Sequence, residues 1–523
     1  MTQDVAFDAG AVRAWAMLAS EALAGARDRI DAANVFPVAD SDTGTNLWLT
    51  ISAGAAAIDL AEQDAAGALE DFAQGALLAA RGNSGIIASE LLRGMAVSLL
   101  AEGSSSAAGA RVARALRAGA DAAHAAVARP APGTMLTAAA GAATAAEHVA
   151  TGAPDDVVRV AEGALAGARA AVLGSPEQLE VLARHGVLDA GAYGLTLVFG
   201  ALCAAVTRTD LAEDSPGESV GLPPRLVISG GRDPEPSAPP VHGHGRCDDP
   251  DGEFEVMYVV EAAPECGSDV ARGLRAGLEE IGESVVVVGG NGLWQVHVHT
   301  DDPAAALAAA GVAALRQVRI RSLVARPAEA EGALRSGVVA GVRSPALLAE
   351  TARSGAVILA RTDRSWAPDE LRRVLEDAAS DRVVAILRQD STSTLRRTLH
   401  RLPGLAVDTI VVPDDLHVVA ALAAREEALG RGADDDEALV AMRGAVGSLT
   451  WGRADAADAD VLVDDLVARA PEREVGLAML LVGAHVPTAT VTAASDRLAS
   501  GLGAEVVTLP SGHADAVVRA GTL

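Results

Sequence analysis

Hydrophobic residues recur with helical spacing through the first part of the chain. From about Ala11 to Thr209 the sequence is a succession of Ala- and Leu-rich segments, separated by short turns of Gly, Ser, Pro and Asp. Alternating β-branched residues are almost absent from this part of the chain. Such spacing is typical of helices that bury one face or are buried all round. It predicts an all-α domain over residues 1–210.

The helical pattern ends in a stretch without periodicity. Residues 211–252 are polar and rich in Pro and Gly, and include the sequence SPGESVGLPPRLVISGGRDPEPSAPPVHGHGRCDDPDG. This composition is typical of an interdomain linker. We therefore expect a linker over residues 211–252.

Strand patterns begin at Phe254. The runs FEVMYVVEA and SVVVVGGNGLWQVHVHT read as strands, with a Gly-Gly-Asn-Gly turn inside the second run and a helical stretch, SDVARGLRAGLEEIG, between them. These patterns predict a small α+β middle domain over residues 253–332. Beyond it, residues 336–523 predict an α/β domain with a parallel sheet, because helical stretches separate most of the apolar runs GVVAGV, AVILA, RVVAIL, AVDTIVVP, GLAMLLV and AEVVTL.

Composition narrows the classes of protein that this chain could represent. With 523 residues it is long enough for several domains, and its net charge of -28 at pH 7 repels nucleic acid and anionic membranes. Aromatic residues make up only 2% of the sequence, so the core must pack small side chains closely. All basic side chains except histidine are arginine. The absence of lysine excludes a P-loop lysine, a Schiff-base lysine and a lysine general base.

Cysteine usage indicates a reducing compartment. Cys203, Cys247 and Cys266 are scattered and form no C-x-x-C motif, so neither a disulfide framework nor a cysteine-rich zinc site is indicated. The first residues, MTQDVAFDAG, are acidic where a signal peptide would be basic, and no uninterrupted apolar run approaches the ~18 residues of a membrane-spanning helix. We expect a cytoplasmic protein without a transmembrane segment.

Four turns in the helical region share one design, in which small or polar residues directly precede an apolar helix. Free N–H groups and the helix dipole make a helix start attractive to anions, and glycine lets a phosphate approach the backbone. Several such starts at one end of a helical domain would bind phosphates without lysine. The four turns are ADSDTGTN (Ala39 to Asn46), RGNSG (Arg81 to Gly85), PGTMLT (Pro132 to Thr137) and LDAGAYG (Leu188 to Gly194).

The first of these turns contains two aspartates, Asp40 and Asp42. Two carboxylates beside a triphosphate are a common way to hold Mg²⁺, and Asn34 could add an amide oxygen. The alternative is that Asp42 caps the following helix while Asp40 is solvated. Capping alone would also account for Ser84 and Thr134, and a turn for Asp189. The spacing leaves both interpretations open, and the presence of four such turns favours a shared ligand.

These motifs together identify a family resemblance. The segments NVFPVADSDTGTN, ARGNSGIIASELLRGMA, PGTMLTAAA and GVLDAGAYGL, in this order, resemble the DAK2 (DhaL-type) nucleotide-binding domain of dihydroxyacetone kinases. The match is closest to the form fused into the bacterial fatty acid kinase catalytic subunit. The resemblance implies an eight-helix antiparallel barrel that binds ATP and two Mg²⁺ ions at one end.

The resemblance also implies roles for individual residues. Asp40 and Asp42 match the metal-binding aspartates of the catalytic centre, and Asn34 stands where a further ligand is expected. Ser41 departs from the glycine that is usual between the two aspartates. The nucleotide-binding positions implied by the match are Thr43, Gly44, Asn46, Gly82, Asn83, Ser84, Gly85, Thr134, Met135, Leu136, Asp189 and Gly191.

A second candidate site lies in the sequence VHVHT. Alternation along a strand places His297 and His299 on the same face, a spacing that suits two imidazoles on one metal ion, although an exposed face with two solvated histidines has the same pattern. The surrounding segment resembles the middle domain of the fatty acid kinase catalytic subunit, where the histidines and a cysteine form a metal-like cluster. Glu255 aligns with that cysteine. Glutamate can ligate Zn²⁺ beside two histidines, so Glu255 leaves a three-ligand site with an open position as one alternative and disfavours a closed structural site.

Other candidate donors and turns carry weaker signals. Cys247 and Cys266 are alternative metal donors only if loops bring them close, and the linker sequence HGHGRC is another histidine pair. In the C-terminal domain the turns RTDRSWAP and RQDSTST lack the Gly- and Asn-rich character expected from the resemblance. Ser391 to Thr394 could cap a helix.

The resemblance implies an ATP-dependent kinase with Mg²⁺ as cofactor and a homodimeric state. Its phosphate acceptor would be a fatty acid presented by a DegV-type binding protein, giving an acyl phosphate. One alternative is phosphorylation of a small ketone such as dihydroxyacetone, although the substrate-holding domain of those kinases is not recognised in this chain. A second alternative is a non-catalytic nucleotide-binding regulator. Asp40 and Asp42 argue against the regulator, and Glu255 leaves it open.

Overall fold

A computed structural model describes most of the 523 residues. The described residues are 7–37, 41–59, 61, 64–102, 107–209, 216–223, 226, 252–262, 267–290, 292–311, 313–324, 336–360, 366–378, 382–400, 402, 404–470 and 475–523. The chain forms two compact units, one of Met1–Asp251 with Val259–Val298 and one of Gly252–Tyr258 with His299–Leu523. The boundary between the units passes through two strands of one sheet.

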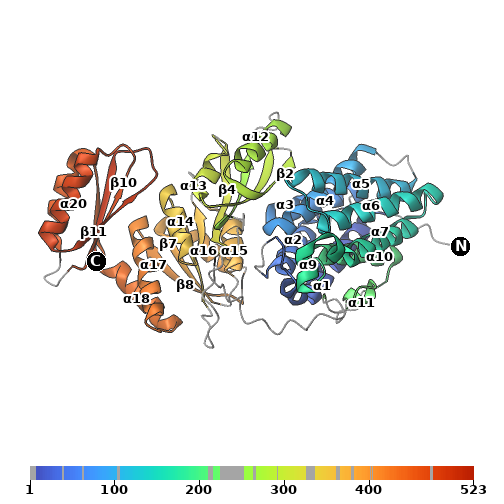
Figure 1. The fold of residues 1–523 in the computed structure, drawn as a ribbon, viewed down its shortest axis with the longest axis horizontal. Coiled ribbons are helices and arrows are strands. Elements are labelled where there is room, and N and C mark those ends of the chain that lie inside the picture. Colours follow the sequence, from blue (N-terminus) through green and yellow to red (C-terminus); the bar gives the residue numbers. More distant parts are fainter. Residues whose placement is uncertain are drawn as a thin grey trace. The chain divides into compact units, whose positions relative to one another are not determined.

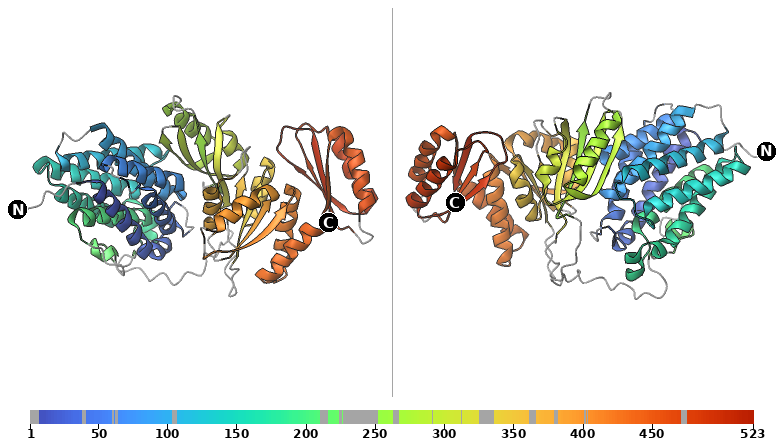
Figure 2. Two further views of the ribbon diagram at one scale, coloured as in Figure 1. Left: turned by 180° about the vertical axis from the view of Figure 1, so that it is seen from behind. Right: turned by 45° about the horizontal axis from the view of Figure 1, so that its top comes forward.

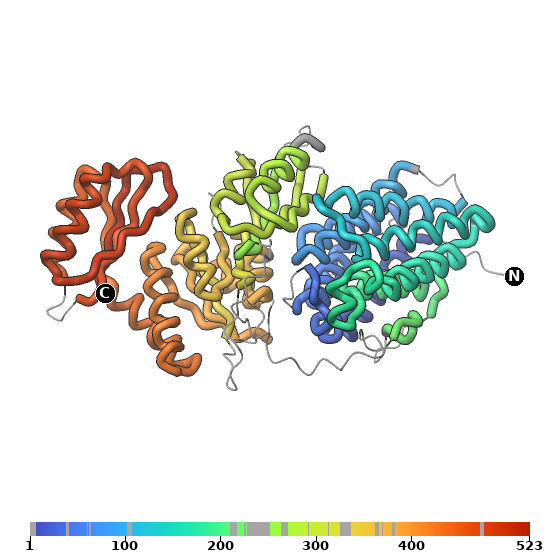
Figure 3. The backbone as a smooth tube through the Cα atoms, viewed as in Figure 1, coloured from blue at the N-terminus to red at the C-terminus, as the bar shows by residue number. Residues whose placement is uncertain are grey.

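Long helices dominate the first unit (Figure 1). Each helix contacts the next along the chain, and the last of them, α10, contacts both α7 and α1, so that the described helices close a ring. Figure 3 follows the chain through this ring, from blue to green. The ring helices are α1 (Ala9–Ala32), α2 (Thr43–Ala57), α3 (Ala65–Ala79), α4 (Gly82–Glu102), α5 (Ala108–Ala126), α6 (Met135–Gly152), α7 (Val157–Leu173) and α10 (Ala190–Thr207).

Small residues allow the helices of the ring to pack closely. A Cβ atom on Gly167 of α7 would lie 2.2 Å from the carbonyl oxygen of Gly141 on α6, so the two backbones are in direct contact. Trp15 is fully buried, donates from its indole nitrogen to the carbonyl oxygen of Val198 at 2.8 Å, and stacks edge-on against Phe72. The core otherwise consists mainly of Ala, Val and Leu, which agrees with the low aromatic content of the sequence.

Part of the expected linker packs into the helical core. The short helix α11 (Pro216–Ser219) lies within residues 211–252, and Val220, Leu222 and Leu226 beside it are buried in the same hydrophobic cluster as the ring helices. The main chain continues this contact, because the N–H group of Leu188 donates to the carbonyl oxygen of Leu226 at 2.9 Å. Residues 227–251 lie outside the described part of the chain.

Two helices of the ring are long and apolar enough to cross a membrane by length and composition alone. They are the segments Gly82–Ala101 of α4 and Ala190–Thr207 of α10, of which 61% and 89% are buried inside the structure. From the sequence we expected no such segment, because polar residues interrupt both apolar runs. Their burial against neighbouring helices is that of core helices in a bundle.

The first unit also contains most of the middle-domain hairpin. Strands β2 (Gly282–Gly290) and β3 (Leu293–Thr300) are neighbours, and α12 (Gly267–Glu279) contacts β2. Strand β2 also contacts α4 and α5, and the segment after α5 pairs with it through a bridge between Val127 and Val286. The N–H group of Ala128 donates to the carbonyl oxygen of Val285 at 3.3 Å. This segment leads directly into the turn before α6.

The middle-domain strands and the following parallel strands form one eight-stranded sheet, ordered β2-β3-β1-β4-β6-β5-β7-β8. Its parallel part is β6-β5-β7-β8, and β4 pairs with β6 antiparallel. The strand β4 was not predicted because its sequence, ALRQVRIRS, is rich in arginine. The further strands are β1 (Phe254–Glu261), β4 (Ala314–Ser322), β5 (Ser336–Val342), β6 (Val357–Ala360), β7 (Arg382–Arg388) and β8 (Ala406–Val412).

Helices connect the strands of this sheet. The helices α15 and α16 pack together, and α15 also contacts β6. The helix α17 contacts β5, β8 and α18. The connecting helices are α13 (Pro303–Ala308), α14 (Leu348–Arg353), α15 (Pro368–Asp377), α16 (Thr392–Leu399), α17 (Asp415–Gly430) and α18 (Asp435–Ser448).

The expectation of one parallel sheet through residues 336–523 was wrong in part. The six predicted apolar runs are all strands, but the last two belong to a second, four-stranded sheet ordered β11-β10-β12-β9. In this sheet β10 pairs parallel with β11 and antiparallel with β12. Strands β9 and β12 were not predicted, because their sequences TWGRAD and VVRAGT have little apolar continuity. The strands of this sheet are β9 (Thr450–Asp455), β10 (Leu477–Val482), β11 (Glu505–Pro510) and β12 (Val517–Thr522).

Helices α19 (Ala459–Arg469) and α20 (Thr488–Leu502) cover the second sheet and share its hydrophobic core. Both views in Figure 2 show a helix lying along the four strands, in red. The C-terminal residues therefore form a sheet with its own core, and the described chain is multidomain, with a helical region followed by two mixed sheets.

Candidate functional site

The four motifs of the helical region all coincide with helix starts. Helices α2, α4, α6 and α10 begin at Thr43, Gly82, Met135 and Ala190. They are the alternate members of the ring, and consecutive helices of such a ring run antiparallel, which places the starts of α2, α4 and α6 at the same end. The start of α10 lies at that end too, because a Cβ atom on Gly191 would lie 3.3 Å from Cβ of Met135 in the first turn of α6. The prediction that these four turns lie at helix starts is confirmed, although Gly82 to Gly85 of the second turn lie inside α4, and the ring brings the four starts together.

Side-chain contacts link the motifs in pairs. A Cβ atom on Gly82 would lie 2.5 Å from Nδ2 of Asn46, which joins the first motif to the second. A Cβ atom on Gly191 would lie 3.3 Å from Cβ of Met135, which joins the third to the fourth. A Cβ atom on Gly194 of α10 would lie 2.5 Å from Cδ1 of Leu47 on α2, so the two pairs are also in contact.

The start of α2 shows an unexpected capping arrangement. Asp42 occupies the N-cap position but makes no side-chain capping hydrogen bond. Instead Asp31, in the last turn of α1, accepts hydrogen bonds at Oδ1 from the N–H groups of Gly44 at 2.6 Å and Thr45 at 3.0 Å. The interpretation of Asp42 as a simple helix cap is therefore wrong. Asp40 lies outside the described residues.

The other predicted residues of the first motif lie close to this point. Asn34 follows α1 and is buried, and its N–H group donates to the carbonyl oxygen of Asp31 at 3.2 Å. Thr43, Gly44 and Asn46 are buried within the first turn of α2. Gly44 is required by packing, because a Cβ atom there would lie 2.4 Å from the carbonyl oxygen of Arg27. The close contact between α1 and α2 therefore explains by itself why residue 44 is glycine.

The start of α4 is held against α2. The N–H group of Arg81 donates to Oγ1 of Thr50 at 3.2 Å, and a Cβ atom on Gly85 would lie 2.4 Å from that same oxygen. Gly82 has φ of +54°, a conformation that favours glycine. The expectation that Ser84 is an N-cap is wrong, because α4 begins at Gly82 and Ser84 lies inside the first turn.

At the starts of α4 and α6 the side chains of Asn83 and Thr134 do not act as helix caps. Asn83 carries a buried Oδ1 atom with no hydrogen-bond partner among the described residues. Thr134 stands at the N-cap position of α6 but makes no side-chain capping bond, and its hydroxyl donates to the carbonyl oxygen of Ala131 at 2.8 Å. Met135 and Leu136 are buried behind it. The capping interpretation of Thr134 is therefore wrong.

Asp189 does cap its helix. Its Oδ1 atom accepts a hydrogen bond from the N–H group of Ala192 at 2.7 Å, a cap that the sequence had indicated only as a turn. Burial raises the pKa of Asp189 to about 7, and hydrogen bonds from the N–H groups of Ala192 and Met135 oppose that shift. Asp189 is thus a buried carboxyl group between α6 and α10. Because Gly191 has no side chain, Met135 of α6 can pack closely against the first turn of α10.

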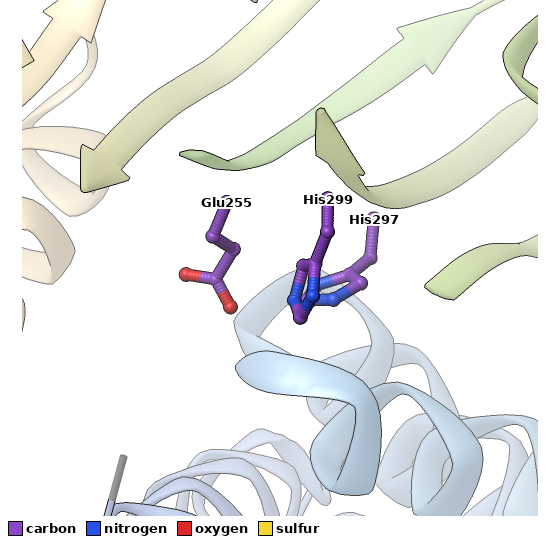
Figure 4. A group of neighbouring side chains, drawn as sticks. All are labelled: Glu255, His297 and His299. Atoms are coloured by element: carbon purple, nitrogen blue, oxygen red, sulfur yellow. The ribbon is translucent and has the colours of Figure 1, made fainter. Parts of the chain in front are cut away.

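The predicted histidine pair forms a buried cluster with Glu255. His297 and His299 lie on β3 and Glu255 on the neighbouring strand β1, and one potential ligand atom from each lies within 4.8 Å of the others. Figure 4 shows both rings together and the carboxylate turned toward them. The prediction that the histidines share a face is confirmed, and the solvated alternative is wrong because all three side chains are buried. This group could hold a metal ion.

Arginines surround the carboxylate of this cluster. Nε of Arg321 donates to Oε2 of Glu255 at 2.5 Å and Nη2 donates to Oε1 at 3.3 Å, while Nη2 of Arg319 lies 3.8 Å from Oε2. Arg319 also pairs with Asp377. Ligand atoms around tetrahedral Zn²⁺ lie about 3.3 Å apart at bond lengths near 2.0–2.1 Å, so coordination would require the three side chains to close up and Glu255 to share its charge with Arg321.

The remaining predicted donors and turns contribute less. Cys247 and Cys266 lie outside the described residues, as does the HGHGRC segment, and Cys203 lies partly buried in α10 of the helical core. Ser391 stands before α16 but makes no side-chain capping hydrogen bond, so the capping interpretation fails there.

Three residues of these sites were not found from the sequence. They are Asp31, Thr50 and Arg321, which hold the starts of α2 and α4 and the carboxylate of Glu255. Only Asp31 carried a usable signal. An acidic residue in the last turn of a helix is opposed by the helix dipole, so its presence at the end of α1 indicates a role outside that helix.

Family comparisons agree with this architecture. Residues 37–204 match the DAK2 domain, and residues 251–327 match the FakA-like middle domain of fatty acid kinases. The chain is therefore a multidomain protein with a DAK2 domain followed by a FakA-like middle domain.

Individual relatives cover only part of the chain. An uncharacterized protein of Staphylococcus saprophyticus is 30% identical over 277 residues, which are 53% of this chain and 48% of the relative. The protein YloV of Bacillus subtilis is 32% identical over 279 residues, with coverage of 52% and 48%. The dihydroxyacetone kinase of C. freundii in complex with AMP-PNP and Mg²⁺ is similar with a TM-score of 0.32 and 13% identity, covering 49% of this chain and 55% of that one. The chain spans about half the length of the curated relatives it matches.

Proposed function

We propose that this protein is an ATP-dependent kinase whose helical ring binds Mg·ATP at the end where α2, α4, α6 and α10 begin. The observation that carries the proposal is the convergence of these four starts with Asp42, whose side chain makes no capping bond. Helix starts offer N–H groups and positive dipole ends to phosphates. In a chain without lysine, arginine and the backbone are the remaining partners for phosphate oxygens.

Asp42, Asp40 and Asn34 would hold Mg²⁺, because all three offer the hard oxygen atoms that this ion prefers. When bound, Mg²⁺ would neutralise charge on the β- and γ-phosphates. The rest of the ring positions the nucleotide. The packed turn of Gly82 to Gly85 and the buried Met135 and Leu136 keep its contact surfaces in place.

The acceptor that best fits the middle domain is a fatty acid presented by a DegV-type binding protein. One carboxylate oxygen of the acceptor would form a bond to the γ-phosphorus as the bond to the β–γ bridging oxygen breaks, giving an acyl phosphate and ADP. A carboxylate is already ionised at neutral pH, so the reaction requires no general base. The match of residues 251–327 to the FakA-like middle domain supports this acceptor over a small ketone.

The buried cluster of Glu255, His297 and His299 is proposed to bind Zn²⁺ once the three side chains close up, with Glu255 sharing its charge between the ion and Arg321. Neutral imidazoles and one carboxylate are an established donor set for this metal. Metal analysis of purified protein should detect zinc in the native chain and less of it in His297→Ala. Equal zinc contents in the two proteins would contradict the assignment.

The kinase proposal is tested by ATP consumption and by binding. Purified protein should consume ATP in the presence of a DegV-type protein loaded with fatty acid, and Asp42→Asn should abolish both turnover and Mg²⁺-dependent ATP binding measured by calorimetry. Turnover with dihydroxyacetone alone would indicate the ketone kinase. Mg·ATP binding without turnover on either acceptor would indicate the non-catalytic regulator.

A further inference from the structure

Asp31 holds the first turn of α2 through three hydrogen bonds. Its Oδ1 atom accepts from the N–H groups of Gly44 and Thr45, and its Oδ2 atom accepts from the hydroxyl of Thr45 at 2.7 Å. N–H groups in a first helical turn are normally satisfied by the N-cap side chain of the same helix. Here the carboxylate comes from the end of the preceding helix, and the N-cap residue Asp42 makes no capping bond.

The main chain of Asp31 also holds the beginning of the segment that joins α1 to α2. Its carbonyl oxygen accepts the N–H group of Asn34, so one residue is bonded to both ends of the segment that joins α1 to α2. That segment carries Asn34 and Asp42, which are two of the three residues proposed to hold Mg²⁺. The position of both relative to each other therefore depends on Asp31.

Close packing makes this attachment rigid. A Cβ atom on Gly44 would lie 2.4 Å from the carbonyl oxygen of Arg27, 2.9 Å from Cβ of Ile30 and 3.0 Å from Oδ1 of Asp31. The first turn of α2 thus rests directly on the last turns of α1. Because the two helices touch through a glycine at this point, the hydrogen bonds of Asp31 set their alignment.

The position of Asp31 is not explained by its own helix. An acidic residue in the last turn of α1 is opposed by the dipole of that helix. Both side-chain oxygens of Asp31 accept hydrogen bonds from the first turn of α2 instead.

We infer that Asp31 is a positioning residue of the Mg·ATP site, which caps α2 in place of Asp42 and so fixes the first turn of α2 beside the proposed metal ligands. This inference rests on the proposed function. It predicts that the geometry of the cap, and not the charge of residue 31, supports metal-dependent nucleotide binding.

The test compares four variants by titrating Mg²⁺ at fixed ATP in calorimetry, with ATP binding in EDTA and the melting temperature measured on the same samples. Asp31→Ala should weaken Mg·ATP binding about tenfold, the effect of losing one good cap. Asp31→Asn should stay within about threefold of the native protein, because its amide can accept from the N–H groups and donate to Thr45. Asp28→Ala is the matched control, since Asp28 is an exposed carboxylate on the same helix. Asp42→Asn should lose the Mg²⁺ dependence.

Thr45→Val provides a second route if Asp31→Ala does not fold, since it removes only the hydroxyl bond and should weaken Mg·ATP binding about threefold. A purely structural role would lower the melting temperature and leave the Mg²⁺ dependence unchanged. Native Mg²⁺ dependence in both Asp31→Ala and Thr45→Val, together with its loss in Asp42→Asn, would overturn the inference and leave the proposed function standing. Native binding in Asp42→Asn would overturn the proposed function itself.

Discussion

Gly82 packs directly against the side chain of Asn46. A Cβ atom on residue 82 would lie 2.5 Å from Nδ2 and 3.3 Å from Cγ of Asn46, and Gly82 has φ of +54°. This contact joins the start of α4 to the start of α2, two of the four helix starts that make up the candidate nucleotide site.

Replacing Gly82 by alanine should therefore disturb both the fold and the site. Gly82→Ala adds a strained backbone conformation and a clash with Asn46, which together should lower the free energy of unfolding by about 1–3 kcal/mol. The displaced Asn46 should also weaken ATP binding. Urea unfolding and calorimetry measure the two effects. Gly152→Ala is the control, because no atom lies within 4 Å of its added Cβ, and it should leave ATP binding unchanged.

Asp189 should make stability depend on pH. Its pKa of about 7 in the folded chain lies above its ordinary value of 3.8. The folded state therefore holds a proton that the unfolded state releases, so this contribution to stability is complete below about pH 4 and is lost as the pH rises to about 7. Asp189→Asn cannot titrate. The difference in unfolding free energy between native protein and variant should change between pH 5 and pH 8, and parallel pH profiles would contradict the assignment.

The pair of Glu255 and Arg321 should couple strongly. Glu255 is 2% exposed and Arg321 holds both of its carboxylate oxygens. Removing one partner of a buried ion pair costs about 3–5 kcal/mol, because a buried charge is left uncompensated. Glu255→Gln should cost less than this, about 1–3 kcal/mol, because the Arg321 side chain left behind is 24% exposed and keeps part of its hydration. A double-mutant cycle with Arg321→Gln should give a coupling energy of about 1–3 kcal/mol.

A surface pair provides the control for that cycle. Arg497 and Asp460 lie 3.1 Å apart with side chains 43% and 65% exposed. Solvent screens an exposed pair, so the same cycle at these residues should give a much smaller coupling energy. Equal coupling energies at the two sites would show that burial does not strengthen the Glu255 pair.

His417 should give a pH dependence of the opposite sign to that of Asp189. Burial, with a contribution from the charge of Arg388, lowers the pKa of His417 to about 4. Between about pH 4 and about pH 6.5 His417 is protonated in the unfolded chain and neutral in the folded chain. Neutral His417 therefore contributes to stability in full above about pH 6.5, and this contribution is lost as the pH falls toward 4. His417→Phe keeps a ring against Trp451, which His417 contacts edge-on at 5.3 Å. The free energy of unfolding should fall between pH 6.5 and pH 4.5 by less in His417→Phe than in the native protein. The difference between the two proteins at pH 8 is the reference.

Local patterns predicted the elements well and their assembly poorly. The helix starts at Thr43, Gly82, Met135 and Ala190 follow from turn residues beside apolar helices, which is information carried within a few positions. The grouping of strands into two sheets does not follow in this way. Pairing between strands depends on contacts distant in sequence, so runs such as VILA and LAMLLV look alike although they belong to different sheets.

The sequence by itself determined which chemical groups are available to this protein: oxygen donors at Asn34, Asp40 and Asp42, paired imidazoles at His297 and His299, and helix starts with small residues in a chain without lysine. Only the tertiary structure decided how those groups are held. Asp31 replaces Asp42 as the cap of α2, and Arg321 engages Glu255 beside the histidines. A buried carboxylate such as that of Asp31 or Glu255 must accept hydrogen bonds from nearby donors. Which donors are near depends on packing between elements that are distant in the sequence, so local sequence patterns do not reveal them.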